Sequence, residues 1–183
     1  MVDTILIKDP LAVISMRNGD TDGKEKWVFI KEGKIESTGG GPYPEADKVI
    51  DAKGMILLPG LINTHHHMFQ TLTRNIPGAQ DAPLFSWLET HYTIWGELSE
   101  EAIYVSAQVA IAELLLSGCT TTSDHLYLFP SKAASKLIDT EIDAAKELGI
   151  RFHPTRGSMS LGKSSGGLPP DDVIQNEEEI IDD

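Results

Sequence analysis

The chain has 183 residues, of which 40% are hydrophobic and 23% charged, and its formal net charge is −13. This composition is that of a globular chain and excludes a disordered one, and the length suits one domain or parts of two. The acidic balance and the lack of a basic run exclude a polybasic nucleic-acid surface, and no apolar run approaches the roughly 20 residues of a membrane span. We therefore expect neither nucleic acid nor membrane as a partner. The single cysteine, Cys119, fits a cytoplasmic location.

The first 58 residues predict short β-strands joined by turns. The segments TILIK (4–8) and KWVFIK (26–31) are rich in β-branched and aromatic residues, and the EGK that follows the second is a tight-turn signal. Two further strand-like pieces lie within residues 48–60, on either side of Lys53-Gly54. No helical period interrupts them, so residues 1–58 form a small β layer.

From Pro59 onward, strands and helices alternate. A second predicted helix starts after Ser99, a favourable N-cap, and Gly118 is a plausible stop. Strand, helix, strand, helix, strand is the rhythm of a parallel sheet or barrel, so the fold class is α/β. The expected elements are a strand at 61–67, helices at 83–95 and from 100 onward, a strand at 119–128, a helix that ends near 148 and a strand at 150–155.

Residues 59–70 read PGLINTHHHMFQ and place three of the six histidines side by side. On a strand, successive side chains alternate between faces, so His65 and His67 point one way and His66 the other. Two imidazoles on one face can converge on a single metal at about 2.0–2.1 Å each. His66 would then face the packing layer. The alternative interpretation is a surface histidine cluster that binds nothing specific.

The string PGLINTHHH resembles the first-strand signature of the amidohydrolase superfamily, in which P-G and a few residues precede H-x-H. The stretches HHHMFQTLTRNIPGAQD, SDHLYLFP (123–130) and HPTRGSMSLG (153–162) are similar to its aminohydrolase branch. This resemblance implies a small β-sandwich segment at 1–58, followed at 59–183 by the first three or so β/α units of a metal-dependent (β/α)8 TIM barrel. Such a barrel needs roughly 250 residues, so it is incomplete in this chain.

The same resemblance implies a set of site residues. His65 and His67 would be metal ligands, Gln70 would face the substrate's ring carbonyl, and His125 and Arg156 would lie in the substrate pocket. Each of the last three has an alternative: a loop amide for Gln70, a structural histidine for His125, and a surface or helix-facing charge for Arg156. No catalytic residue is assigned within the chain, because the acid/base Glu and a late Asp are expected beyond residue 183.

Other reactive or aromatic side chains are expected to be structural. His91 lies within a predicted helix, and His153 is followed by proline. Cys119 lacks the neighbours of a nucleophile and is expected to be an ordinary buried thiol. Trp87 and Trp95 are expected to pack rather than to stack on a base.

The activity implied by the resemblance is hydrolytic deamination of a nucleobase-like heterocycle, of 8-oxoguanine or guanine type, with release of ammonia. It would use one divalent metal ion, zinc before iron, and relatives of this kind assemble as homo-oligomers. Two alternatives remain open: a triazine-type amino- or chlorohydrolase, and a non-catalytic, truncated metal-binding remnant. The 183-residue chain by itself is predicted to be inactive.

Overall fold

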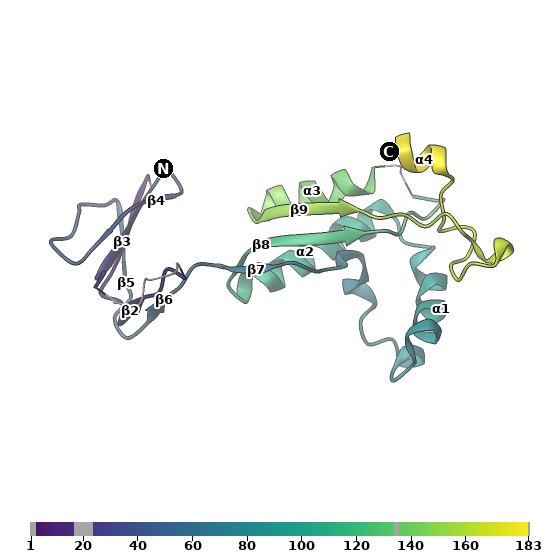
Figure 1. Cartoon of the computed structure of the whole chain (residues 1–183), viewed down its shortest axis with the longest axis horizontal. Coiled ribbons are helices and arrows are strands. Elements are labelled where there is room, and N and C mark those ends of the chain that lie inside the picture. Colours follow the sequence, from purple (N-terminus) through teal and green to yellow (C-terminus); the bar gives the residue numbers. More distant parts are fainter. Residues whose placement is uncertain (1–2, 17–23, 134–135, 183) are drawn as a thin grey trace. The chain divides into compact units, whose positions relative to one another are not determined.

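The computed structural model describes residues 3–16, 24–133 and 136–182 (Figure 1). The chain divides into two compact units, Met1–Pro59 and Gly60–Asp183. The boundary falls beside the change from β-rich to alternating sequence at Pro59. Each unit has its own sheet, and the candidate site residues all belong to the second.

The first unit contains only β-strands in its described part. A four-stranded sheet has the order β4-β3-β1-β5, in which β1 runs antiparallel to β3 and parallel to β5. Glu32 and Gly33, both with positive φ, form the tight turn between β3 and β4 that the EGK string predicts. The strands are β1 (Thr4–Lys8), β3 (Trp27–Lys31), β4 (Lys34–Gly39) and β5 (Lys48–Asp51), with a second pair formed by β2 (Ala12–Val13) and β6 (Ile56–Leu57).

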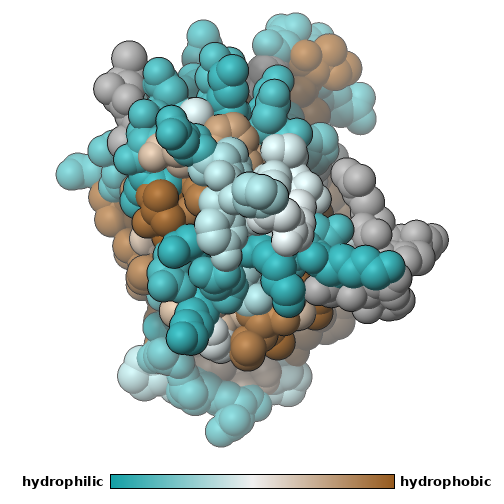
Figure 2. Space-filling view, turned by 90° about the vertical axis from the view of Figure 1, so that its left-hand side faces the viewer, coloured by the Kyte–Doolittle hydropathy of each residue, from teal (hydrophilic) through white to brown (hydrophobic). Residues whose placement is uncertain are grey.

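This small unit buries few large side chains. Leu6, Val28 and Ala52 are buried, whereas Ile35 and Val49 are among the apolar side chains that stay exposed. Figure 2 shows apolar surface, in brown, between hydrophilic side chains. A unit of under 60 residues has too little interior to bury all its apolar side chains.

The second unit is a three-stranded parallel sheet with helices, which confirms the predicted α/β class (Figure 1). The strand order is β7-β8-β9, and α2 and α3 pack against each other and against this sheet. The strands are β7 (Leu61–Asn63), β8 (Cys119–Leu126) and β9 (Arg151–Arg156). The helices are α1 (Leu84–Trp95), α2 (Glu100–Leu116), α3 (Leu137–Leu148), α4 (Glu177–Asp182) and the 3-10 helices η1 (Met68–Thr73), η2 (Pro77–Ala79) and η3 (Lys163–Ser165).

The ends of α2 follow the predicted capping signals. The Ser99 hydroxyl accepts a hydrogen bond from the Ala102 amide at 3.2 Å, and two glutamates lie in the first turn, where the helix dipole favours them. Gly118, with φ of +87°, follows the last turn as predicted. Neither α2 nor any other helix in the described ranges is long and apolar enough to cross a bilayer.

The histidine-bearing strand is shorter than predicted. Strand β7 ends at Asn63 rather than continuing to His67, and its register against β8 shifts after Leu61. The Asn63 side chain donates to the Thr122 hydroxyl at 3.1 Å, and η1 begins at Met68. The residues between them therefore run along the end of β8 without forming a regular ladder.

Candidate metal and substrate site

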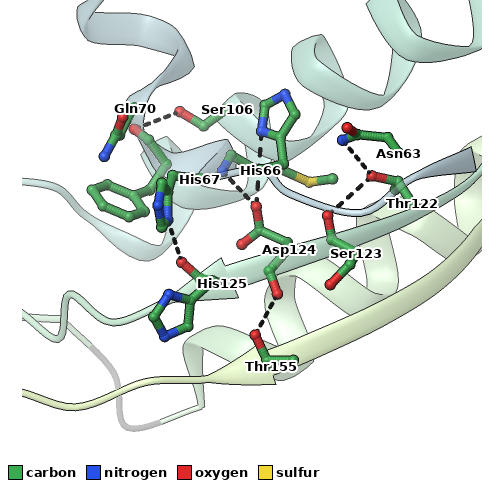
Figure 3. A network of polar contacts seen from close by, with 12 residues as sticks. Asn63, His66, His67, Gln70, Ser106, Thr122, Ser123, Asp124, His125 and Thr155 are labelled. Carbon is green, nitrogen blue, oxygen red and sulfur yellow. Dashed lines mark hydrogen bonds and ion pairs between the residues drawn. The ribbon is translucent and has the colours of Figure 1, made fainter.

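The three consecutive histidines divide between two sides of the chain, as their alternation predicts. The rings of His65 and His67 meet edge to face with their centroids 4.9 Å apart. His66 points the other way, and its Nδ1 lies 3.8 Å from the Asp124 carboxyl oxygen (Figure 3). Although β7 stops before them, His65 and His67 lie together, and their role as metal ligands stays a prediction.

His67 is fixed in the form that binds metals. Its Nδ1 lies 2.8 Å from the main-chain carbonyl oxygen of His125. A carbonyl oxygen only accepts, so Nδ1 carries the hydrogen and Nε2 presents its lone pair. Partial burial lowers the pKa of His67, an effect that outweighs the hydrogen bond to His125 and leaves the ring neutral at pH 7.

The histidine pair fits part of a metal site. A zinc site takes three or four ligands, and paired imidazoles are a common component of it. Within the described ranges, no group of three or more His, Cys, Asp or Glu side chains is arranged to hold a metal. His65 and His67 would supply two ligands of such a site, and the position of any others stays a prediction.

Tyr127 completes the surroundings of the histidines and was not identified from the sequence. Its ring centroid lies 5.2 Å from that of His67, 5.6 Å from that of His125 and 5.3 Å from that of Phe69. Burial raises the pKa of Tyr127 to about 12, so its hydroxyl is neutral. The available signal was its position two residues beyond His125, which places it on the same side of an extended chain.

Gln70 lies between this cluster and a neighbouring pocket. Its side-chain amide donates to the Tyr127 hydroxyl at 3.5 Å (Figure 3 shows Gln70 beside His67). It also lines an open pocket of about 400 Å³ next to η1, η2 and α1. His91 closes one side of that pocket and is structural as predicted: it is buried, and its Nδ1 donates to the Trp87 carbonyl at 2.8 Å.

His125 is exposed at the end of β8, with its ring centroid 5.5 Å from that of His67. A side chain at Gly157, just after β9, would collide with the His125 Nε2 and the Tyr127 Cβ. Glycine at this position therefore lets the ends of two strands approach closely around the rings. The structure thus brings together His65, His67, Gln70 and His125.

Arg156 is not brought into that cluster. It is paired in register with Leu126, whose side chain is buried, rather than with His125. Its guanidinium lies 4.1 Å from the centre of the Phe129 ring and donates to Gln175 at 2.6 Å. Both partners lie in irregular segments, after β8 and before α4, and the substrate-binding role of Arg156 stays a prediction.

Two buried carboxyl groups lie behind the histidines. Burial raises the pKa of Asp124 on β8 to about 7 and that of Glu141 on α3 to about 9, the latter also through the negative charge of Asp124. Glu141 is fully buried. Its neighbours along α3, Leu137, Ala144 and Ala145, form a buried face at helical spacing, and that spacing was the signal for a buried glutamate.

The chain belongs to the amidohydrolase family, whose model, described as "Amidohydrolase family", matches residues 56–182. It is 44% identical over 180 residues to an 8-oxoguanine deaminase of Pseudomonas aeruginosa, covering 97% of this chain and 39% of that protein. It is 37% identical to a hydroxydechloroatrazine ethylaminohydrolase of Pseudomonas sp., covering 85% of this chain and 35% of the relative.

Among solved structures, the chain is similar to an atrazine chlorohydrolase from Arthrobacter aurescens complexed with zinc, with a TM-score of 0.87 and 34% identity. That match covers 97% of this chain and 41% of the hydrolase. The chain thus spans about two fifths of the length of its relatives. The second unit has the fold of the first β/α units of the amidohydrolase barrel, as predicted.

Proposed function

We propose that the protein containing this chain is a metal-dependent hydrolase that removes an amino group, as ammonia, from a purine-like ring of the 8-oxoguanine or guanine type. One observation carries the proposal. His65 and His67 converge, with the Nε2 of His67 presented by the His125 carbonyl, in a chain that matches an 8-oxoguanine deaminase over 97% of its length.

The metal in this proposal is a divalent ion, zinc before iron, and the zinc-complexed atrazine chlorohydrolase supports that choice. When bound, such an ion lowers the pKa of a water molecule and so provides hydroxide near neutral pH. His65 and His67 would hold it as neutral imidazoles. The remaining ligands and the carboxylates that move protons are expected outside residues 1–183.

The residues around the histidines would bind the ring. The Gln70 amide can donate to a ring carbonyl from its place beside Tyr127. His125 and Tyr127 present ring surfaces next to His67 and to each other, and such surfaces stack on flat heterocycles. Because Tyr127 stays neutral, it adds no charge that would repel an electron-rich base.

The direct test is ammonia release from 8-oxoguanine and guanine by the full natural protein. We expect turnover with at least one of them, and a rise in KM of about tenfold or more for Gln70→Leu, the loss of one directional hydrogen bond. Gln108→Leu is the matched control, because Gln108 lies on α2 and bonds to Glu147, away from the histidines. Metal-loaded protein that deaminates neither base would reject the proposal.

A triazine-type amino- or chlorohydrolase is the second candidate. The identities of 37% and 34% to an ethylaminohydrolase and an atrazine chlorohydrolase favour it. The same assay with amino- and chlorotriazines separates the two candidates by the product released. A natural protein with an intact mass of 20.0 kDa that hydrolyses none of these rings would instead be the non-catalytic remnant.

We also propose a cytoplasmic location and a homo-oligomeric assembly. A single cysteine that is buried as a free thiol supports the first. The resemblance to an oligomeric enzyme family supports the second. Cell fractionation and the solution mass of the natural protein test them.

A further inference from the structure

Three hydrogen bonds join the histidine segment to the end of β8. The His125 amide donates to the His66 carbonyl at 3.0 Å, and His67 Nδ1 donates to the His125 carbonyl at 2.8 Å. The third runs from the Met68 amide to the Asp124 carboxyl oxygen Oδ1 at 2.7 Å (Figure 3). Only the third uses a side chain of β8, so Asp124 is the one β8 partner in these three bonds that a substitution can remove.

Burial makes a negative charge on Asp124 energetically unfavourable. Asp124 is 1% exposed and Glu141 is fully buried. Apart from each other, the Asp124 oxygen Oδ2 and both Glu141 oxygens find no hydrogen-bond partner among the described residues. Two buried carboxylates side by side would repel each other, whereas one shared proton turns the contact into an attraction.

The surroundings of the two carboxyl groups indicate which of them would hold the shared proton. Asp124 accepts a main-chain hydrogen bond, which favours its charged form, and Glu141 has no such donor. Glu141 is therefore the carboxyl group that would hold a shared proton and donate toward Asp124, because burial and the negative charge of Asp124 both raise its pKa. Asp124 stays an acceptor for the Met68 amide.

We propose that Asp124, backed by the buried Glu141, is a positioning residue that fixes the main chain at Met68 and thereby sets the imidazoles of His65 and His67 for the metal. The inference rests on the proposed function, because the positions of His65 and His67 matter only if they bind a metal. We call the Met68–Asp124 hydrogen bond, with Glu141 behind it, the clamp. Met68 is fully buried and starts η1 directly after His67, so a shift of its amide moves His67.

The clamp requires a hydrogen-bond donor at Glu141 and a hydrogen-bond acceptor at Asp124. Glu141 acts as a neutral donor, so glutamine can replace it and leucine cannot. Asp124 acts as an acceptor, so asparagine retains the oxygen that Met68 needs and alanine does not. Asp139, exposed on the same helix two residues before Glu141, offers a matched control in Asp139→Asn.

The first measurement is the affinity of the full natural protein for zinc, by competition with a chelator. We expect Asp124→Ala and Glu141→Leu to weaken zinc binding by about 10- to 100-fold, the range for outer partners of metal ligands, and Asp124→Asn and Glu141→Gln to stay within about threefold of wild type. Asp139→Asn should not change it. Unfolding midpoints of the metal-free proteins, measured in parallel, show whether each variant is folded.

A folded Asp124→Ala protein that binds zinc as tightly as wild type would overturn the proposal, since the carboxyl would then serve stability alone. Equal losses in Glu141→Gln and Glu141→Leu would overturn the donor role of Glu141. If Asp124→Ala does not fold, the zinc affinities of Glu141→Gln and Glu141→Leu still test the proposal.

The hydrogen-exchange rate of the Met68 amide in the metal-free protein tests the bond between Met68 and Asp124 without any metal. We expect this amide to exchange slowly in wild type and in Glu141→Gln, and at least about tenfold faster in Glu141→Leu. Unchanged exchange in Glu141→Leu would contradict the clamp. A wild-type protein that binds no zinc would reject the proposed function, while the exchange rates would still test the clamp.

Discussion

The two sides of the segment that carries the histidines differ in character. On one side His65, His67 and His125 present rings that are exposed or half-buried. On the other, His66 meets Asp124 in a layer covered by helices. The open side can exchange ligands with solvent, whereas the covered side carries hydrogen bonds that hold the segment still. A binding site of this kind thus draws its rigidity from residues that the ligand never meets.

A large effect on stability should come from the buried core next to the histidine segment. Trp95 is fully buried, donates from its indole nitrogen to the Thr73 hydroxyl at 2.9 Å and packs edge to face on Phe69. We expect Trp95→Ala to cost about 3–5 kcal/mol in the free energy of unfolding. His65→Ala, on the open side, should change the stability of the metal-free protein very little. Denaturant unfolding measures the loss in free energy of unfolding for both variants. Equal losses in Trp95→Ala and His65→Ala would contradict the expected difference.

A smaller effect should follow from closing the gap between the strand ends. The new Cβ in Gly157→Ala would collide with His125 and Tyr127, so both rings must move. We expect a cost of about 1–3 kcal/mol and a fall in kcat/KM of at least about tenfold. Gly78→Ala is the control, because a Cβ there meets open space. If Gly157→Ala keeps full activity, the arrangement of the rings around His67 is not needed for turnover.

The buried carboxyl pair should make stability depend on pH. Burial raises the pKa of Glu141 to about 9 and that of Asp124 to about 7, so the folded protein keeps protons that the unfolded chain has released. Stability should therefore be greatest below about pH 4 for this pair and fall as the pH rises toward 9. Urea unfolding across this range should show a flatter slope for Glu141→Gln, and an unchanged slope would contradict a shared proton.

The smallest of these effects concerns Arg156. Lysine keeps the charge but loses the planar contact with Phe129 and the directed bond to Gln175. We expect Arg156→Lys to cost about 1 kcal/mol of stability and to leave KM unchanged. A tenfold or larger rise in KM, by contrast, would return Arg156 to the substrate pocket that the sequence predicted for it.

The sequence alone predicted the parts that follow from local chemistry. The start of α2 at Ser99 and its end before Gly118 follow from capping and backbone conformation. The shared side of His65 and His67 follows from the alternation of an extended chain. Sequence reasoning extended β7 too far, because its pairing with β8 is set by tertiary register and not by β-propensity.

The carboxyl pair could not be found in the same way. Asp124 and Glu141 lie 17 positions apart and meet only because α3 packs back on the sheet. Nothing in the local sequence around Asp124 indicates that its partner is another acid. Tyr127 follows from the alternation rule, because it lies two residues beyond His125 on an extended chain.

The central claim is that His65 and His67 hold a metal, and the metal content of the full natural protein tests it most directly. Bound metal should fall from about one ion per chain to almost none in His65→Asn and His67→Asn, because each loses one of few ligands. His66→Asn, on the covered side, is the matched control and should retain most of its metal. Full metal content in both ligand variants, or a loss confined to His66→Asn, would contradict the account.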